Sequence, residues 1–286
     1  MQVIQGLHLC VNGDYTSSIL KKKMGTVFFQ GRFELLPPTP LSVSGLVIWL
    51  DGDDPSATGS KPSNGTAISS WVDKSQSGMI TSFTQATVGN RPVYASSALN
   101  SRGGVTFTGS SSHSISTTMT TSNLNLGTNT FTMFFVLTGA TGGSLLFRGD
   151  NPGIWTSPNK KLWLGNGTTI EGSSGLYPSI VGWGQNYVVG ASPASNPFIL
   201  TVVGNTSAPR ITYYRNSATS ADSLGTNTYA PISDGSITGL TIGIGQQSPN
   251  LTGTLCEMLV YNKILSADER STITNILAQK YNITVT

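Results

Sequence analysis

The chain of 286 residues carries 16 basic and 13 acidic side chains, which gives a formal net charge of +3. Only 10% of its residues are charged and the basic ones are scattered, so it lacks the dense basic face that nucleic-acid binding requires. Its 33 glycines, with many Ser, Thr and Asn residues, favour strands and turns over helices. The sequence therefore predicts a mostly β protein that does not bind nucleic acid.

Two cysteines, Cys10 and Cys256, are too few and too far apart for a disulfide framework or a metal site. Cys256 lies in an apolar run, which predicts an inert thiol in the core. No apolar run approaches the length of a membrane span, and the first residues, MQVIQGLHLCVNGD, lack the basic and apolar regions of a signal peptide. We therefore expect no membrane span and no export through a signal peptide.

Residues 1–40 differ from the rest of the chain. An Asn-Gly-Asp turn signal at 12–14 separates two short β-like pieces, and a Pro-Pro-Thr-Pro run at 37–40 forms a stiff, extended connector. A segment of this size cannot bury its own core. We therefore predict an N-terminal extended or β arm, residues 1–40, that docks on the main domain, residues 41–286, or on a partner. The residues assigned to assembly are a basic run, which also fits a solvated turn, and three aromatic residues: Lys21, Lys22, Lys23, Phe28, Phe29 and Phe33.

Acidic residues crowd the segment LVIWLDGDDPSATGSKPSNGTAISSWVDKSQSG, which begins at Leu46. Oxygen ligands close in sequence can form a Ca²⁺ site, although this spacing does not match an EF-hand loop. Aspartates before Pro and Gly also cap turns through bonds to the backbone, and this interpretation is preferred over a metal site. The four candidate ligands are Asp51, Asp53, Asp54 and Asp73.

Many short β runs follow, separated by Gly, Asn, Ser and Pro. They are LVIWL, GVTFTG, TFTMFFVLT, SLLFRG, KLWLG, FILTVVG, RITYYRN, LTIGIG and TLCEMLVYN. Runs of this length, without amphipathic helices between them, predict an all-β fold, a two-sheet antiparallel jelly-roll sandwich. Nearly every residue from Phe131 to Leu137 is apolar, which predicts a central strand covered on both faces.

The middle of the chain offers side chains of the kind that hold sugars, because sugar sites combine an exposed aromatic ring with Asp, Asn and backbone groups. Trp163 lies within an alternating apolar run and is interpreted as packing. The residues predicted to bind a glycan are Asp150, Asn151, Trp155, Trp183 and Tyr187.

The C-terminal residues predict one α-helix. Ser266 is followed three residues later by Glu269, which is the pattern of a capping box. The helix is expected from about residue 267 to 280, packed against the sandwich through a stripe of apolar residues at helical spacing: Ile273, Ile276, Leu277 and Tyr281.

Both ends of the main domain contain recognisable stretches. LSVSGLVIWLDGDDPS, ISSWVDKSQSG, QATVGNRPVY and GVTFTGSSSHSIS open it, and LTIGIG with LTGTLCEMLVYNKILSADERSTITNILAQKYNI closes it. In this order they resemble the concanavalin A-like lectin/glucanase superfamily, in its laminin-G-like jelly-roll branch. The resemblance covers residues 41–286, with a weak middle at 139–235. It implies the fold more strongly than the function, since such domains occur in bacterial secreted proteins and in structural proteins of phages and large viruses.

The superfamily that the chain resembles includes glucanases, whose carboxyl pair comes from one strand in a Glu-x-Asp-x-x-Glu pattern. The four glutamates of this chain lack an acidic partner at strand spacing: Glu34, Glu171, Glu257 and Glu269. His8 and His113 lie in the arm and in a Ser-rich turn, without a nucleophile elbow. The sequence thus predicts a protein that is not an enzyme and has no cofactor, apart from the Ca²⁺ alternative.

Two functions remain. The preferred one is a non-enzymatic virion structural protein, a capsid decoration, minor capsid or tail-associated protein that is oligomeric in the particle. Its partners would be other capsid or tail proteins, bound through the arm, and it could also adhere to surface glycans. The alternative is a carbohydrate-binding, lectin-like module of a cell-surface or secreted protein. The lack of a signal peptide and of a catalytic domain favours the virion.

Overall fold

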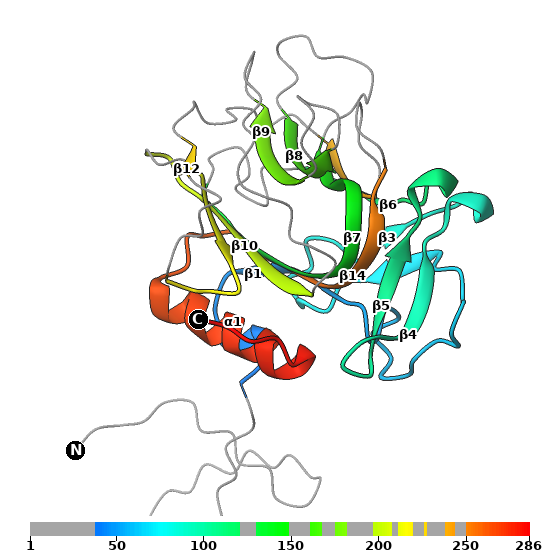
Figure 1. Cartoon of the computed structure of the whole chain (residues 1–286), viewed down its shortest axis with the longest axis horizontal. Helices are drawn as coiled ribbons and strands as arrows, with labels where there is room; N and C mark the ends of the chain where they lie inside the picture. The colour runs from blue at the N-terminus through cyan, green and yellow to red at the C-terminus, as the bar shows by residue number, and fades with distance from the viewer. Residues whose placement is uncertain are drawn as a thin grey trace, which may run out of the picture. The chain divides into compact units, whose positions relative to one another are not determined.

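The structure is a computed structural model that describes residues 38–120, 130–148, 161–167, 175–181, 197–207, 211–219, 226–227, 238–243 and 250–286. In these residues the chain forms two antiparallel sheets and a C-terminal α-helix (Figure 1), which confirms the predicted jelly-roll sandwich. No helix of this described part is long and apolar enough to cross a membrane.

The residues of the arm that were assigned to assembly lie outside the described residues: Lys21, Lys22, Lys23, Phe28, Phe29 and Phe33. The arm, its boundary and its assembly role therefore stay predictions.

The first sheet brings together the beginning and the end of the domain. Its strands are β1 (Leu46–Asp51), β4 (Val93–Leu99), β5 (Arg102–Phe107), β7 (Thr132–Arg148), β10 (Phe198–Gly204), β11 (Ile211–Arg215), β12 (Thr226–Asn227) and β14 (Thr252–Tyr261). β14 pairs with β7 along one edge and with both β1 and β5 along the other. Since β1 opens the domain and β14 nearly ends it, this pairing holds together residues about 200 positions apart.

The second sheet uses the other half of β7. Its remaining strands are β2 (Ser70–Val72), β3 (Ser82–Thr84), β6 (Ile115–Thr120), β8 (Lys161–Gly167), β9 (Gly175–Val181) and β13 (Thr238–Ile242). β7 pairs with β10 and β14 in its first half and with β8 and β13 in its second. Gly139, at φ +61°, lies between these halves, and β7 curves from one sheet into the other in Figure 1. The two runs predicted here, TFTMFFVLT and SLLFRG, are therefore one continuous strand.

Three short 3-10 helices complete the described elements: η1 (Pro40–Ser42), η2 (Val88–Asn90) and η3 (Gly109–Ser111). The strands that the sequence did not predict are short or interrupted by polar residues: β2, β3, β4, β6, β9 and β12.

Residues 131–137 of the central segment are all buried, as predicted. Met133, Phe135 and Leu137 belong to the core cluster that also contains Trp71. Phe134 and Val136 alternate with them and join the cluster that contains α1. Because successive side chains of a strand point to opposite faces, each face of β7 has its own hydrophobic layer.

The C-terminal helix α1 (Ala267–Tyr281) confirms the predicted element and its packing stripe. Ile273, Leu277 and Tyr281 are fully buried, and Ile276 is partly buried against the same cluster. α1 packs beside β10, as Figure 1 shows. The capping box is present: the Ser266 hydroxyl accepts a hydrogen bond from the Glu269 N–H at 3.2 Å, and the Glu269 carboxylate accepts one from the Ser266 N–H at 2.8 Å.

Replacing Ser266 with alanine should lower the free energy of unfolding by about 1 kcal/mol, because it leaves one N–H of the first turn without its side-chain acceptor. Denaturant titration measures the loss. Gln279→Ala, at an exposed position of the same helix, is the control and should change stability by less than about 0.5 kcal/mol. An equal loss in both variants would contradict the capping role.

Candidate functional site

The acidic turn begins at the end of β1, where Asp51 is the last residue of the strand. Gly52 follows and donates its N–H to the Cys256 carbonyl at 2.8 Å. A Cβ at this position would lie 2.6 Å from that carbonyl oxygen, so only glycine allows the turn to approach β14 this closely. Asp54 then accepts bonds from the N–H groups of Thr58 and Gly59, which caps the following turn.

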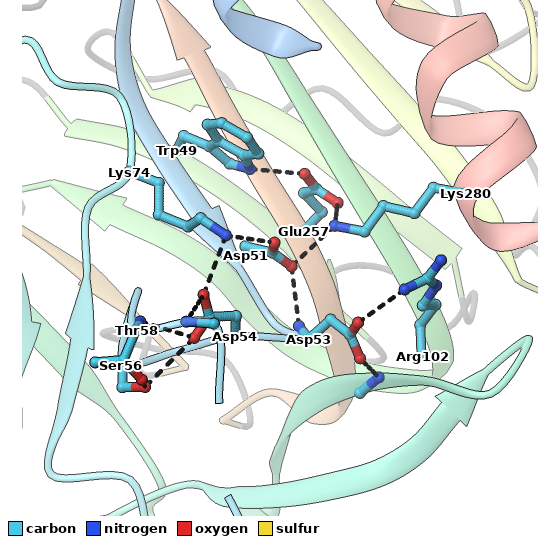
Figure 2. A network of polar contacts seen from close by, with 12 residues as sticks. Trp49, Asp51, Asp53, Asp54, Ser56, Thr58, Lys74, Arg102, Glu257 and Lys280 are labelled. Atoms are coloured by element: carbon cyan, nitrogen blue, oxygen red, sulfur yellow. Dashed lines mark hydrogen bonds and ion pairs between the residues drawn. The ribbon is translucent and has the colours of Figure 1, made fainter. Parts of the chain in front are cut away.

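Four cations contact the carboxylates at this corner, and Figure 2 shows Lys74, Arg102 and Lys280 among them. Lys280 of α1 contacts Asp51 at 2.9 Å and Glu257 of β14 at 2.7 Å. Lys74 contacts the other oxygen of Asp51 at 3.0 Å and also reaches Asp54 at 3.3 Å.

Asp53 completes this corner cluster through two further cations. Lys61 lies 2.8 Å from its carboxylate and Arg102 lies 3.2 Å away. The corner cluster thus balances four carboxylates with four cations: Asp51, Asp53, Asp54 and Glu257 with Lys61, Lys74, Arg102 and Lys280.

The burial of these groups is unequal, and their pKa values differ accordingly. The Glu257 side chain is 1% exposed, and this burial raises its pKa although Lys280 opposes the shift. Burial also acts to raise the pKa of Asp51, but Lys280 and Lys74 outweigh it and hold that pKa below its usual value. The two carboxylates raise the pKa of Lys280 against the opposing effect of burial. Hydrogen bonds from the indole N–H of Trp49 at 2.7 Å and the Tyr281 hydroxyl at 2.8 Å fix Glu257 in place.

Asp73 binds a different set of groups. Its carboxylate accepts the Trp49 N–H at 2.7 Å and bonds from both the N–H and the hydroxyl of Ser75. The Lys74 N–H donates to the Trp49 carbonyl, and the hydroxyls of Ser75 and Ser77 donate to the Val47 carbonyl. The WVDKSQSG stretch therefore provides hydrogen-bond partners for the edge of β1 that does not pair with β14. Without them the backbone N–H and C=O groups of this edge would be unpaired.

The four candidate calcium ligands do not converge on a common point. Among the described residues, no group of three or more His, Cys, Asp or Glu side chains is arranged to hold a metal ion. Asp51, Asp53 and Asp54 have lysine and arginine as their nearest charged partners, and Asp73 caps backbone groups. Calcium binding stays a prediction, and a melting experiment with and without added Ca²⁺ tests it.

The predicted glycan residues, Asp150, Asn151, Trp155, Trp183 and Tyr187, lie outside the described residues, in the segments 149–160 and 182–196. The strands that carry these segments are described. Phe147 of β7 pairs with Trp163 of β8, and Lys161 of β8 pairs with Val181 of β9. The end of β7, the start of β8 and the end of β9 therefore lie at one end of the second sheet.

Two further sequence predictions concern single side chains. Cys256 is fully buried and burial raises the pKa of its thiol to about 12, which confirms an inert core cysteine. His113 accepts a hydrogen bond from the Thr108 N–H at 3.2 Å through Nδ1, so it holds the turn around η3.

Comparison with known proteins identifies the fold and no family. No protein-family model matches the chain, and no curated protein matches its sequence. Domain 4 of AbnA, a GH43 extracellular arabinanase from Geobacillus stearothermophilus solved with arabinotriose, is similar with a TM-score of 0.50 and 13% identity, over 80% of this chain and 98% of that one. A GH54 α-L-arabinofuranosidase is similar with a TM-score of 0.51 and 16% identity, over 75% of this chain and 51% of that one.

A sialidase from Trypanosoma rangeli, solved with sialic acid, gives a TM-score of 0.47 and 16% identity over 88% of this chain. The chain spans 35% of that sialidase. The likeness to the arabinanase domain and the arabinofuranosidase establishes a shared β-sandwich fold, whereas membership of the laminin-G-like branch stays a prediction.

These comparisons correct the expectation that the chain is not an enzyme. The β-sandwich is shared with glycoside hydrolases or domains of them, so the fold gives no ground for excluding catalysis. The expectation rested on the spacing of acidic residues within one strand. Such spacing does not reveal two carboxylates that lie on neighbouring strands. Asp51 and Glu257 are such a pair, directly opposite each other on β1 and β14. The chain's fold, shown by structure and comparison alike, is a β-sandwich of the kind found in carbohydrate-active enzymes.

Proposed function

We propose that this chain is a carbohydrate-binding β-sandwich domain, with its glycan site at the end of the second sheet where β7, β8 and β9 meet. The supporting observation is the strand register. The segments 149–160 and 182–196 contain all five predicted glycan residues, and both are attached to that one end. An exposed aromatic ring and a few polar groups that converge are the usual parts of a sugar site.

The similar structures support the same proposal. The one that this chain matches over 98% of its length is an arabinanase domain that holds arabinotriose. Because that match extends over the entire domain, a short oligosaccharide such as arabinotriose is a suitable first ligand. A screen of many oligosaccharides would identify the natural sugar.

Calorimetry with arabinotriose, together with a glycan array, tests this function. We expect binding to at least one oligosaccharide, and we expect Trp155→Ala and Trp183→Ala each to weaken it by about 30-fold, since the loss of an aromatic anchor costs about 2 kcal/mol. Val88→Ala, at an exposed residue of η2, should bind like the unchanged protein. No binding to arabinotriose or to any arrayed glycan would refute the proposal, as would unchanged affinity in both tryptophan variants.

The virion role stays a second hypothesis. It depends on the arm, residues 1–40, which lies almost entirely outside the described residues, and the similar structures reported above are not viral. Attachment through the arm predicts that a chain lacking residues 1–40 no longer copurifies with particles.

A further inference from the structure

The amine of Lys280 lies between two buried acids. It reaches Asp51 Oδ1 at 2.9 Å and Glu257 Oε2 at 2.7 Å, and these three residues come from α1, β1 and β14. The Asp51 side chain is 9% exposed, that of Glu257 is 1% exposed and that of Lys280 is 20% exposed. The amine therefore contacts two carboxyl groups that are largely shielded from bulk water, and Figure 2 shows it between them.

The chain contains an exposed counterpart. Lys263 contacts Glu269 at the same distance of 2.7 Å, but those side chains are 35% and 32% exposed, and no second acid among the described residues contacts the amine. Water stabilises both charges of such a surface pair. In the corner cluster burial weakens that stabilisation and raises the pKa of Glu257, while the two carboxylates hold the pKa of Lys280 above its usual value, so Glu257 is the acid best able to take a proton from the ammonium.

We propose that Lys280 and Asp51 join spontaneously in an intramolecular isopeptide bond, with Glu257 transferring the protons. The bond would connect the C-terminal helix α1 covalently to β1, the first strand of the domain. The two ends of the domain, which strand pairing and ion pairs hold together, would then also be linked covalently.

The reaction balances without a co-reactant. Glu257 takes one proton from the Lys280 ammonium, and its buried position, which raises its pKa, favours this protonated form. Glu257 passes this proton on to Oδ1 of Asp51, because a carboxylic acid accepts an amine whereas a carboxylate anion does not. The neutral Nζ then attacks Cγ of Asp51 to form the C–N bond. Negative charge on Oδ2 is stabilised by the Lys74 ammonium 3.0 Å away. The C–O bond then breaks, and one carboxyl oxygen leaves as water. Both protons of this water come from the former ammonium, one of them by way of Glu257.

Intact-protein mass spectrometry of the purified full-length chain tests this bond. We expect the mass of the sequence less one water molecule. After proteolysis we expect one branched peptide that contains both Asp51 and Lys280. A full sequence mass, in fresh and in aged protein, would overturn the proposal.

Peptide mapping removes the main alternative source of the same mass. Asp51 precedes Gly52, and closure of this pair into a succinimide also releases one water. That product leaves Lys280 on its own separate peptide, so finding it would likewise overturn the proposal.

Lys280→Arg keeps the charge without the amine and Glu257→Gln removes the proton carrier, so each variant should show its full sequence mass. Lys263→Arg, the control, should still lack one water. If a variant fails to fold, the mass and map of the unchanged protein decide.

Discussion

Replacing Lys280 with methionine is expected to lower the free energy of unfolding by at least about 3–5 kcal/mol, because it leaves Asp51 and Glu257 as buried charges without a lysine partner and also removes the proposed bond between α1 and β1. Methionine nearly preserves the volume of the lysine stem, so the loss does not come from a cavity. Denaturant unfolding at neutral pH measures it.

The matched control is Lys263→Met, which removes the cation of the exposed pair with Glu269. It should cost about 1 kcal/mol or less, as is usual for surface ion pairs. The difference between Lys280→Met and the unchanged protein should also shrink as the pH falls, because protonation removes the negative charges that the methionine variant leaves without a partner. A cost for Lys280→Met no larger than that of the control would show that the corner cluster does not need its lysine.

Replacing Trp71 with alanine should cost about 3–5 kcal/mol, since the side chain is fully buried in the core between the sheets and truncation leaves a cavity. Its indole N–H also donates to the Asp51 carbonyl at 3.1 Å, so the variant removes the link between β2 and the acidic turn. Urea titration of the variant measures the loss.

Trp71→Phe separates these two contributions. It retains most of the ring, so we expect a smaller loss of about 1–3 kcal/mol, from the unpaired carbonyl and the missing volume. Val88→Ala, at a side chain that is 68% exposed, should stay within about 0.5 kcal/mol of the unchanged protein. If Trp71→Ala is no more destabilised than Val88→Ala, then Trp71 does not anchor this core.

Local patterns made much of the fold predictable. The capping box and apolar stripe located α1 to within a residue at its end, and the continuous apolar run from Phe131 to Leu137 identified the strand that is buried on both faces. Strands such as β2 and β4 were missed because they are short or polar on one side, and they form only where neighbouring strands supply hydrogen bonds.

The candidate sites were predictable only in part. The sequence drew attention to Asp51, Asp53 and Asp54 because they are crowded, and it predicts that aromatic residues of the middle, which lie outside the described residues, bind sugar. It gave no reason to join Asp51 with Glu257, Lys74 and Lys280, which lie 23 to 229 positions away from each other along the chain. Glu257 lacks an acidic partner within its own strand, and its acidic neighbour Asp51 lies on the adjacent strand β1.

By itself, the sequence determined the class of fold, the terminal helix and the turn-forming character of the acidic segment, because periodicity, capping and turn chemistry act over a few residues. Only the tertiary structure decided which charges meet. The antiparallel register of β1 on β14 places Asp51 opposite Glu257, and α1 packs on that sheet so that Lys280 reaches both. Contacts of this kind depend on strand pairing between the two ends of the domain, and no local pattern encodes that pairing.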